Sequence, residues 1–136
     1  KEKNIVFKIY WAIRILLFKR LQFKYDTYIY LNTCGPGLWL PHLGGIIINC
    51  KEMGCNCSVN KGVVIGNKAG QSARPIIGDN CYFLLGCKVV GDVKIGANSV
   101  ICQNSVVVKD VACNSIVSGV PAKVIKTFEK ISDIKL

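Results

Sequence analysis

The sequence of 136 residues has one histidine, four prolines and only eight acidic residues. One histidine is too few for a metal site with three histidine ligands, and Cys55 and Cys57 lack a second pair at ligand spacing, so no metal is expected. Lys8 and Arg14 interrupt the N-terminal apolar run, and no small-residue cleavage site follows it. We therefore expect neither a cleaved signal peptide nor a membrane span there.

Cysteine and basic residues are plentiful by contrast. The eight cysteines occur in a chain rich in Val and Ile, unlike a disulfide scaffold, so reduced and mostly buried thiols in the cytoplasm are expected. Four of them receive no role from the sequence, namely Cys50, Cys55, Cys102 and Cys113. The net charge of +10 suggests an anionic partner or a solvated surface. Nucleic acid is not expected as that partner, because no nucleic-acid-binding motif is present.

Residues 4–23 predict a helix, because the segment has no Gly or Pro and begins at a plausible cap, Asn4. On a helical wheel, Asn4, Lys8, Lys19 and Gln22 cluster on one side, and most other positions are apolar. We expect this helix to pack on the rest of the protein. Contact of residues 1–23 with the inner face of the membrane is the alternative.

A six-residue period predicts the fold of the following segment. The larger apolar residues that repeat at this interval are Ile77, Phe83, Val89, Ile95, Ile101 and Val107. The smaller residues four positions after each of them are Cys81, Cys87, Val93, Ser99, Ser105 and Val111. Two inward positions in every six residues are typical of a parallel β-helix, with three rungs in each triangular coil. This fold is expected from about Cys34 to Val111.

The period is less regular upstream. Met53, Val59 and Ile65 keep the phase, whereas Leu40 and Ile46 continue it only with a one-residue slip between Ile46 and Met53. Residues 67–74 (NKAGQSAR) are too polar for a rung and are expected to form a loop that leaves the β-helix. Loops on a rigid scaffold often carry function.

The rung phase turns His42 away from the interior, beside Gly44 and Gly45. An outward imidazole can take a proton from an attacking hydroxyl group. Four segments then resemble the bacterial hexapeptide-repeat acyltransferases, in the serine acetyltransferase-like branch that includes capsular polysaccharide O-acetyltransferases. They are GLWLPHLGGIIIN, VNKGVVIGN, PIIGDNCYFLLGCKVVGDVKIGANSVI and SGVPAKVIK.

This resemblance covers about residues 34–126. It implies an all-β protein, a left-handed parallel β-helix with a short N-terminal α-helix. It also implies a homotrimer with active sites between subunits, and acetyl-CoA as cosubstrate. The expected divisions are residues 1–33 for the basic helix and connector, 34–126 for the acyltransferase domain and 127–136 for a C-terminal tail.

The resemblance also assigns residues. His42 matches the general base, and Asp26 is the candidate for orienting its ring. The candidate contacts to the acceptor, a small molecule or a glycan, are Asn49, Lys61 and Arg74. The candidate contacts to the cofactor are Gly66, Asn67, Leu85, Gln103, Gly119, Val120, Lys123 and Lys126.

The acceptor is inferred from departures from the serine acetyltransferase pattern. Pro41 replaces a carboxylate before the histidine, and Arg74 stands where a second histidine is usual. Because groups that would hold an amino acid are missing, the favoured function is O-acetylation of a sugar hydroxyl in capsular or exopolysaccharide biosynthesis. Serine O-acetyltransferase activity is the alternative, and a non-catalytic solenoid for assembly or binding is a third.

Overall fold

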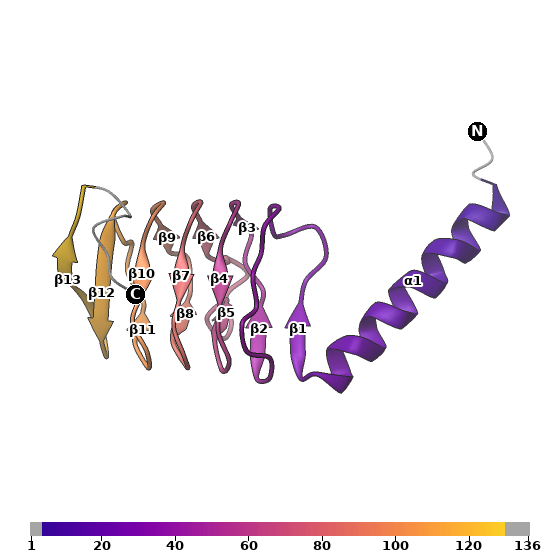
Figure 1. Ribbon diagram of the computed structural model, residues 1–136, viewed down its shortest axis with the longest axis horizontal. Helices are drawn as coiled ribbons and strands as arrows, with labels where there is room; N and C mark the ends of the chain where they lie inside the picture. Colours follow the sequence, from indigo (N-terminus) through magenta and orange to yellow (C-terminus); the bar gives the residue numbers. More distant parts are fainter. Residues whose placement is uncertain (1–3, 130–136) are drawn as a thin grey trace.

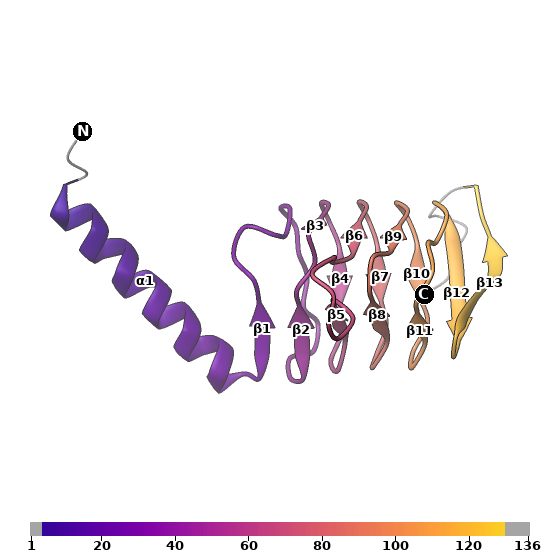
Figure 2. The same ribbon diagram turned by 180° about the vertical axis from the view of Figure 1, so that it is seen from behind.

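The protein is described by a computed structural model that covers residues 4–129. Figures 1 and 2 show, from opposite sides, a prism of stacked short strands with one helix projecting from its N-terminal end. The helix α1 spans Ile5–Lys24. All strand pairs are parallel except the last, so the expected fold class, a left-handed parallel β-helix with an N-terminal helix, is confirmed.

Three sheets form the sides of the prism. Face A comprises β1 (Thr27–Ile29), β2 (Ile46–Ile48), β5 (Val64–Gly66), β8 (Lys88–Val90) and β11 (Val106–Val107). Face B comprises β3 (Glu52–Met53), β6 (Ile76–Ile77) and β9 (Lys94–Ile95). Face C comprises β4 (Ser58–Val59), β7 (Tyr82–Phe83), β10 (Val100–Ile101), β12 (Ser115–Gly119) and the antiparallel β13 (Ala122–Thr127).

The core consists of vertical stacks inside these faces. Ile48, Ile65, Val89 and Val107 follow one another on face A, one in each coil. The inward residues predicted from the period, both the larger and the smaller set from Ile77 to Val111, are all buried. Cys57, Cys81 and Cys87 are buried among them, as predicted, and so is Cys50, for which the sequence indicated no role. Their burial removes apolar surface from water along the whole prism.

The predicted phase is wrong at Ile46. Ile48 pairs with Ile65 and therefore takes the larger inward position, while Ile46 lies level with Val63 at the smaller one. The extra residues are not located between Ile46 and Met53. They lie in the loop of residues 41–45, just before β2, and this loop carries His42. The polar loop predicted at 67–74 does leave the prism, between β5 and β6.

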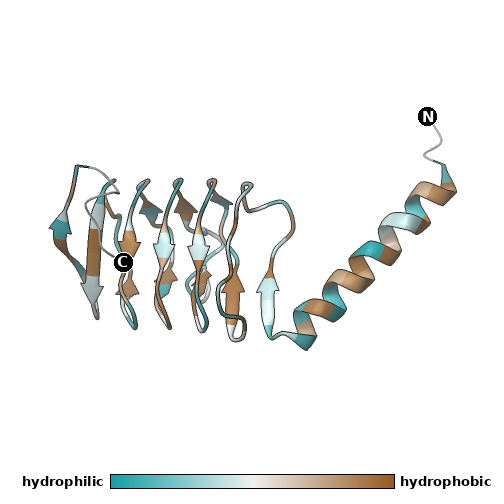
Figure 3. Ribbon diagram, viewed as in Figure 1, coloured by the Kyte–Doolittle hydropathy of each residue, from teal (hydrophilic) through white to brown (hydrophobic). Residues whose placement is uncertain are grey.

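Helix α1 was expected to pack on the prism, but it does not. It begins with an N-cap at Asn4, whose side-chain oxygen accepts a hydrogen bond from the Val6 amide at 3.2 Å. None of its residues is buried, and apolar residues occur along its entire length (Figure 3). Its junction with the prism is β1, where the Gln22 side-chain amide donates a hydrogen bond to the Ile29 carbonyl at 2.6 Å. The helical wheel showed which residues are polar but not whether a partner surface exists.

The two ends of the chain limit what can be compared with the expectations. Most of the predicted C-terminal tail, residues 127–136, lies outside the described residues, as do residues 1–3 of the predicted basic segment. Within residues 4–129, no helix has the length and apolar character needed to cross a membrane.

Candidate active site

The loop of residues 41–45 presents His42 at the surface of the prism. Gly44 and Gly45 have φ values of +109° and +63°, a conformation that a residue with a side chain rarely adopts. This requirement explains the two consecutive glycines. The side chain of His42 is exposed and makes no hydrogen bond within the described residues, so its ring is accessible to a substrate.

The side chain of Asp26 supports this loop by accepting a hydrogen bond from the loop backbone. Its Oδ2 accepts a hydrogen bond from the Gly45 amide at 2.8 Å, and the neighbouring Thr27 hydroxyl accepts one from the Gly44 amide at 3.4 Å. The structure places Asp26 at the base of the loop. Among residues 4–129, no hydrogen bond joins its carboxylate to the imidazole of His42. Sequence reasoning missed Thr27, whose side chain gives no signal in the rung pattern.

A column of residues runs away from this loop along one corner of the prism. The amides of Gly62, Gly86 and Asn104 donate to the carbonyls of Gly44, Lys61 and Leu85 respectively, at 3.0, 3.0 and 2.9 Å. These bonds place Gly44, Lys61, Leu85 and Gln103 on consecutive coils. The predicted residues Lys61, Leu85 and Gln103 are therefore brought together in one line that starts beside His42.

The same column reaches the turn between β12 and β13. The Gly119 amide donates to the Ser105 hydroxyl at 3.2 Å, and Val120 beside it is 71% exposed. Since adjacent strands are about 4.8 Å apart, four steps place this turn about 19 Å from the level of His42. Lys123 and Lys126 follow on β13 with exposed side chains.

Lys88 stabilises this corner, a role that sequence reasoning also missed. Its ammonium group donates hydrogen bonds to the carbonyls of Gly62 and Gly86 at 3.2 and 3.0 Å. The side chain thus joins two coils of the column. Its outward position in β8 was visible in the sequence, but the reach of a lysine to a neighbouring corner was not.

A second polar cluster lies at the other edge of face A. The Arg74 guanidinium donates to the side-chain oxygen of Asn49 at 3.3 Å, and the Asn49 amide donates to the side-chain oxygen of Asn67 at 3.4 Å. Asn67 in turn donates to the Gln71 carbonyl at 2.7 Å, which closes the base of the loop at 67–74. Gly66 ends β5 next to this cluster.

The predicted site residues therefore fall into two groups within one chain. His42, Lys61, Leu85 and Gln103 line the corner before the face A strands, whereas Asn49, Gly66, Asn67 and Arg74 lie at the corner after them. The expected acceptor set and the expected cofactor set are both divided in this way. Among residues 4–129, no group of three or more His, Cys, Asp or Glu side chains could hold a metal ion.

Comparison with known proteins gives the class of this fold. Residues 74–109, which comprise β6 to β11, match the model of the bacterial transferase hexapeptide family (six repeats). The chain is also 36% identical over 94 residues to a serine acetyltransferase of Mycobacterium tuberculosis, covering 67% of this chain and 41% of that protein.

Two solved structures share this fold. The serine acetyltransferase of Neisseria gonorrhoeae in complex with serine is 36% identical, with a TM-score of 0.62 over 67% of this chain and 38% of that one. A serine acetyltransferase in complex with CoA shares the fold, with a TM-score of 0.72 and 24% identity over 84% of this chain and 48% of that one. The chain spans less than half the length of each of these proteins.

Proposed function

We propose that this chain catalyses acetyl transfer from acetyl-CoA to a hydroxyl group, with His42 as general base. The observation that carries the proposal is the exposed imidazole on a loop that Asp26 and Thr27 hold at one end of the surface column. The imidazole takes the hydroxyl proton as the oxygen attacks the thioester carbonyl. The carbon–sulfur bond then breaks, the acetyl group stays on the oxygen, and the CoA sulfur takes the proton.

The column suits an extended cofactor. CoA has its thiol at one end and its phosphates at the other, joined by the flexible pantetheine arm. Leu85 and Gln103 lie between His42 and the β12–β13 turn, and the cations of Lys123 and Lys126 lie beyond that turn. Ammonium groups suit phosphates as compact cations, so we assign the phosphate end of CoA to β13 and the thioester to His42.

A homotrimer would complete the site. Within one chain, the width of β5 separates the His42 corner from the cluster of Asn49, Gly66, Asn67 and Arg74, about 10 Å for three residues. We propose that the groove between two copies takes one of these corners from each. The acceptor would then lie between His42 and Lys61 of one copy and the Asn49–Arg74 pair of its neighbour.

The acceptor we propose is L-serine. The similarity to serine acetyltransferases, one of them solved with serine, supports this choice over the sugar hydroxyl favoured by the sequence pattern. The sugar remains the second candidate on one observation, the proline at position 41 in place of a carboxylate. Capsular or exopolysaccharide biosynthesis has no support from the relatives found.

The test is release of CoA from acetyl-CoA with L-serine or with a panel of sugars. We expect serine-dependent release that falls by about 100- to 10,000-fold in His42→Ala, the usual contribution of a general base. Asp26→Ala should lower turnover less, because it acts through the loop. Undiminished turnover in His42→Ala would exclude the mechanism, and release with a sugar but not with serine would reverse the choice of acceptor.

A further inference from the structure

Helix α1 has an apolar surface that no part of the described chain covers. Its most exposed apolar side chains are Ile5, Val6, Leu16 and Phe23, which are 71, 66, 69 and 80% exposed. None of its 20 residues is buried. Exposed apolar surface of this extent marks a site of interaction in a folded protein.

The charge of α1 limits what the partner can be. Five cations, Lys8, Arg14, Lys19, Arg20 and Lys24, are distributed along the helix, and no acidic residue occurs between positions 5 and 24. A partner surface must therefore offer apolar contact and negative charge together. Tyr10 and Trp11 are half exposed among these residues, and such aromatic side chains favour the boundary between hydrocarbon and water.

On a second copy of this chain, neither α1 nor face A meets these requirements. Another α1 would bring five further cations against the first five. The outward residues of face A, the adjoining side of the prism, include one cation and no acid. They are Tyr28, Ile47, Val64, Lys88 and Val106. Association of α1 with either surface would leave its charges unopposed by acidic groups.

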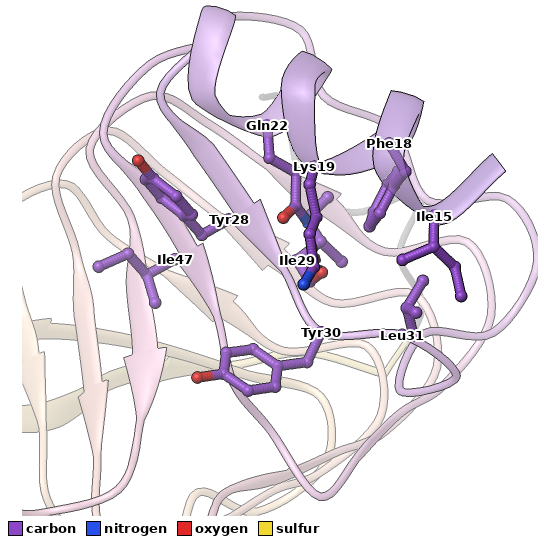
Figure 4. Close-up of a pocket in the computed structure, with 9 residues that line it drawn as sticks. All are labelled: Ile15, Phe18, Lys19, Gln22, Tyr28, Ile29, Tyr30, Leu31 and Ile47. Atoms are coloured by element: carbon purple, nitrogen blue, oxygen red, sulfur yellow. Dashed lines mark hydrogen bonds between the residues drawn. The ribbon is translucent and has the colours of Figure 1, made fainter. Parts of the chain in front are cut away.

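The apolar surface continues from α1 onto the prism. A groove of about 630 Å³ lies between the last turns of the helix and β1. Figure 4 shows Ile15 and Phe18 of the helix on one side and Tyr28 and Tyr30 on the other, with Lys19 beside them. The helix and the adjoining edge of the prism thus offer one continuous surface with a cation near the groove.

We infer that α1 docks this protein on anionic lipid bilayers. Apolar side chains and cations share all sides of α1. The helix would therefore lie in the interface with its apolar side chains in the acyl boundary, and its long lysine and arginine side chains would extend to lipid phosphates. It is not long and apolar enough to cross the membrane. This inference goes beyond acetyl transfer and is independent of it, because it concerns a surface distinct from the His42 column.

Vesicle binding tests the inference with the full chain. In a Trp39→Phe background, Trp11 is the one remaining tryptophan, and its fluorescence should shift to the blue with vesicles of phosphatidylcholine and phosphatidylglycerol. Vesicles of phosphatidylcholine alone should bind at least tenfold more weakly. Since each cation near an anionic surface contributes about a factor of five, Lys19→Gln with Arg20→Gln should weaken binding about 25-fold.

The matched control removes two cations from elsewhere on the prism, with Lys94→Gln and Lys109→Gln, and should leave binding unchanged. Circular dichroism should show the same β-structure in every variant, because each replaced side chain is exposed. Equal binding to both kinds of vesicle, or none to either, would overturn the inference. A third outcome would also overturn it, namely that the parent protein does not bind vesicles and that Leu16→Ser lowers the oligomeric mass measured by sedimentation. In that case α1 would pair with another copy of the chain.

Discussion

The prism and helix α1 contain the same kinds of apolar side chain, but these side chains are buried in the prism and exposed on α1. In the prism, a six-residue interval returns one apolar residue per rung to the interior, where neighbours above and below cover it. In α1, apolar residues occur on all sides, and the single strand at its junction cannot cover them. Apolar composition alone therefore does not create a core. The spacing of the residues and the presence of a facing surface decide whether a side chain is buried.

The largest expected effect tests that contrast directly. Phe83 is fully buried, and Phe83→Ala should lower the free energy of unfolding by about 3–5 kcal/mol, because it leaves a cavity in the stack. Leu16→Ser on α1 should change it by no more than about 0.5 kcal/mol. Urea denaturation measures both. A comparable loss in the two variants would mean that α1 is part of the folding unit.

A smaller effect separates close contact between two coils from backbone conformation in a loop. A Cβ atom at Gly78 would lie 2.7 Å from the Ala97 nitrogen and 2.9 Å from its Cα on the next coil, so Gly78→Ala must push backbone apart. We expect a loss of about 1–3 kcal/mol in the free energy of unfolding. The control is Gly70→Ala in the polar loop, where φ is +79° and no atom lies within 4 Å. That substitution should cost only about 1–2 kcal/mol of local strain, and a larger loss there than at Gly78 would contradict the close stacking.

The smallest effect requires no change of stability. Burial raises the pKa of the Cys87 thiol to about 12, whereas Cys113 is exposed. Because the thiolate is the reactive form, iodoacetamide at neutral pH should modify Cys113 in the native protein and spare Cys87. Mass spectrometry of the digested protein locates the label. Equal labelling of the two in the absence of denaturant would show that the prism opens readily.

Much of the prism could be predicted from the sequence because a solenoid repeats one local rule. The inward positions from Ile77 onward follow from counting by six, and so does the burial of Cys81 and Cys87. Counting fails at Ile46, because the period records that residues are inserted but not where they leave the rung. The exposure of α1 was missed for a different reason. A helical pattern specifies its own faces and contains no information about the surface opposite them.

The candidate site was only partly predictable. The exposure of His42 was predicted from a rung phase that does not hold there, because residues 41–45 form a loop just before β2. The bond between Asp26 and the Gly45 amide depends on a contact between two coils, which residue types do not reveal. Lys61 and Arg74 were grouped as acceptor contacts, yet they belong to opposite corners of face A. Their assignment to corners depends on how many residues each coil uses, and that number is irregular in this region.

The final antiparallel strand has a consequence for how these molecules can associate. A parallel β-helix ends in strand edges that invite another chain to continue the coil. Here β13 folds back on β12 and occupies the C-terminal edge of face C, with its direction reversed and with Lys123 and Lys126 exposed along it. A second prism arriving at this face would meet the wrong strand direction and a positive charge. On face C, β13 therefore disfavours end-to-end stacking of a second prism.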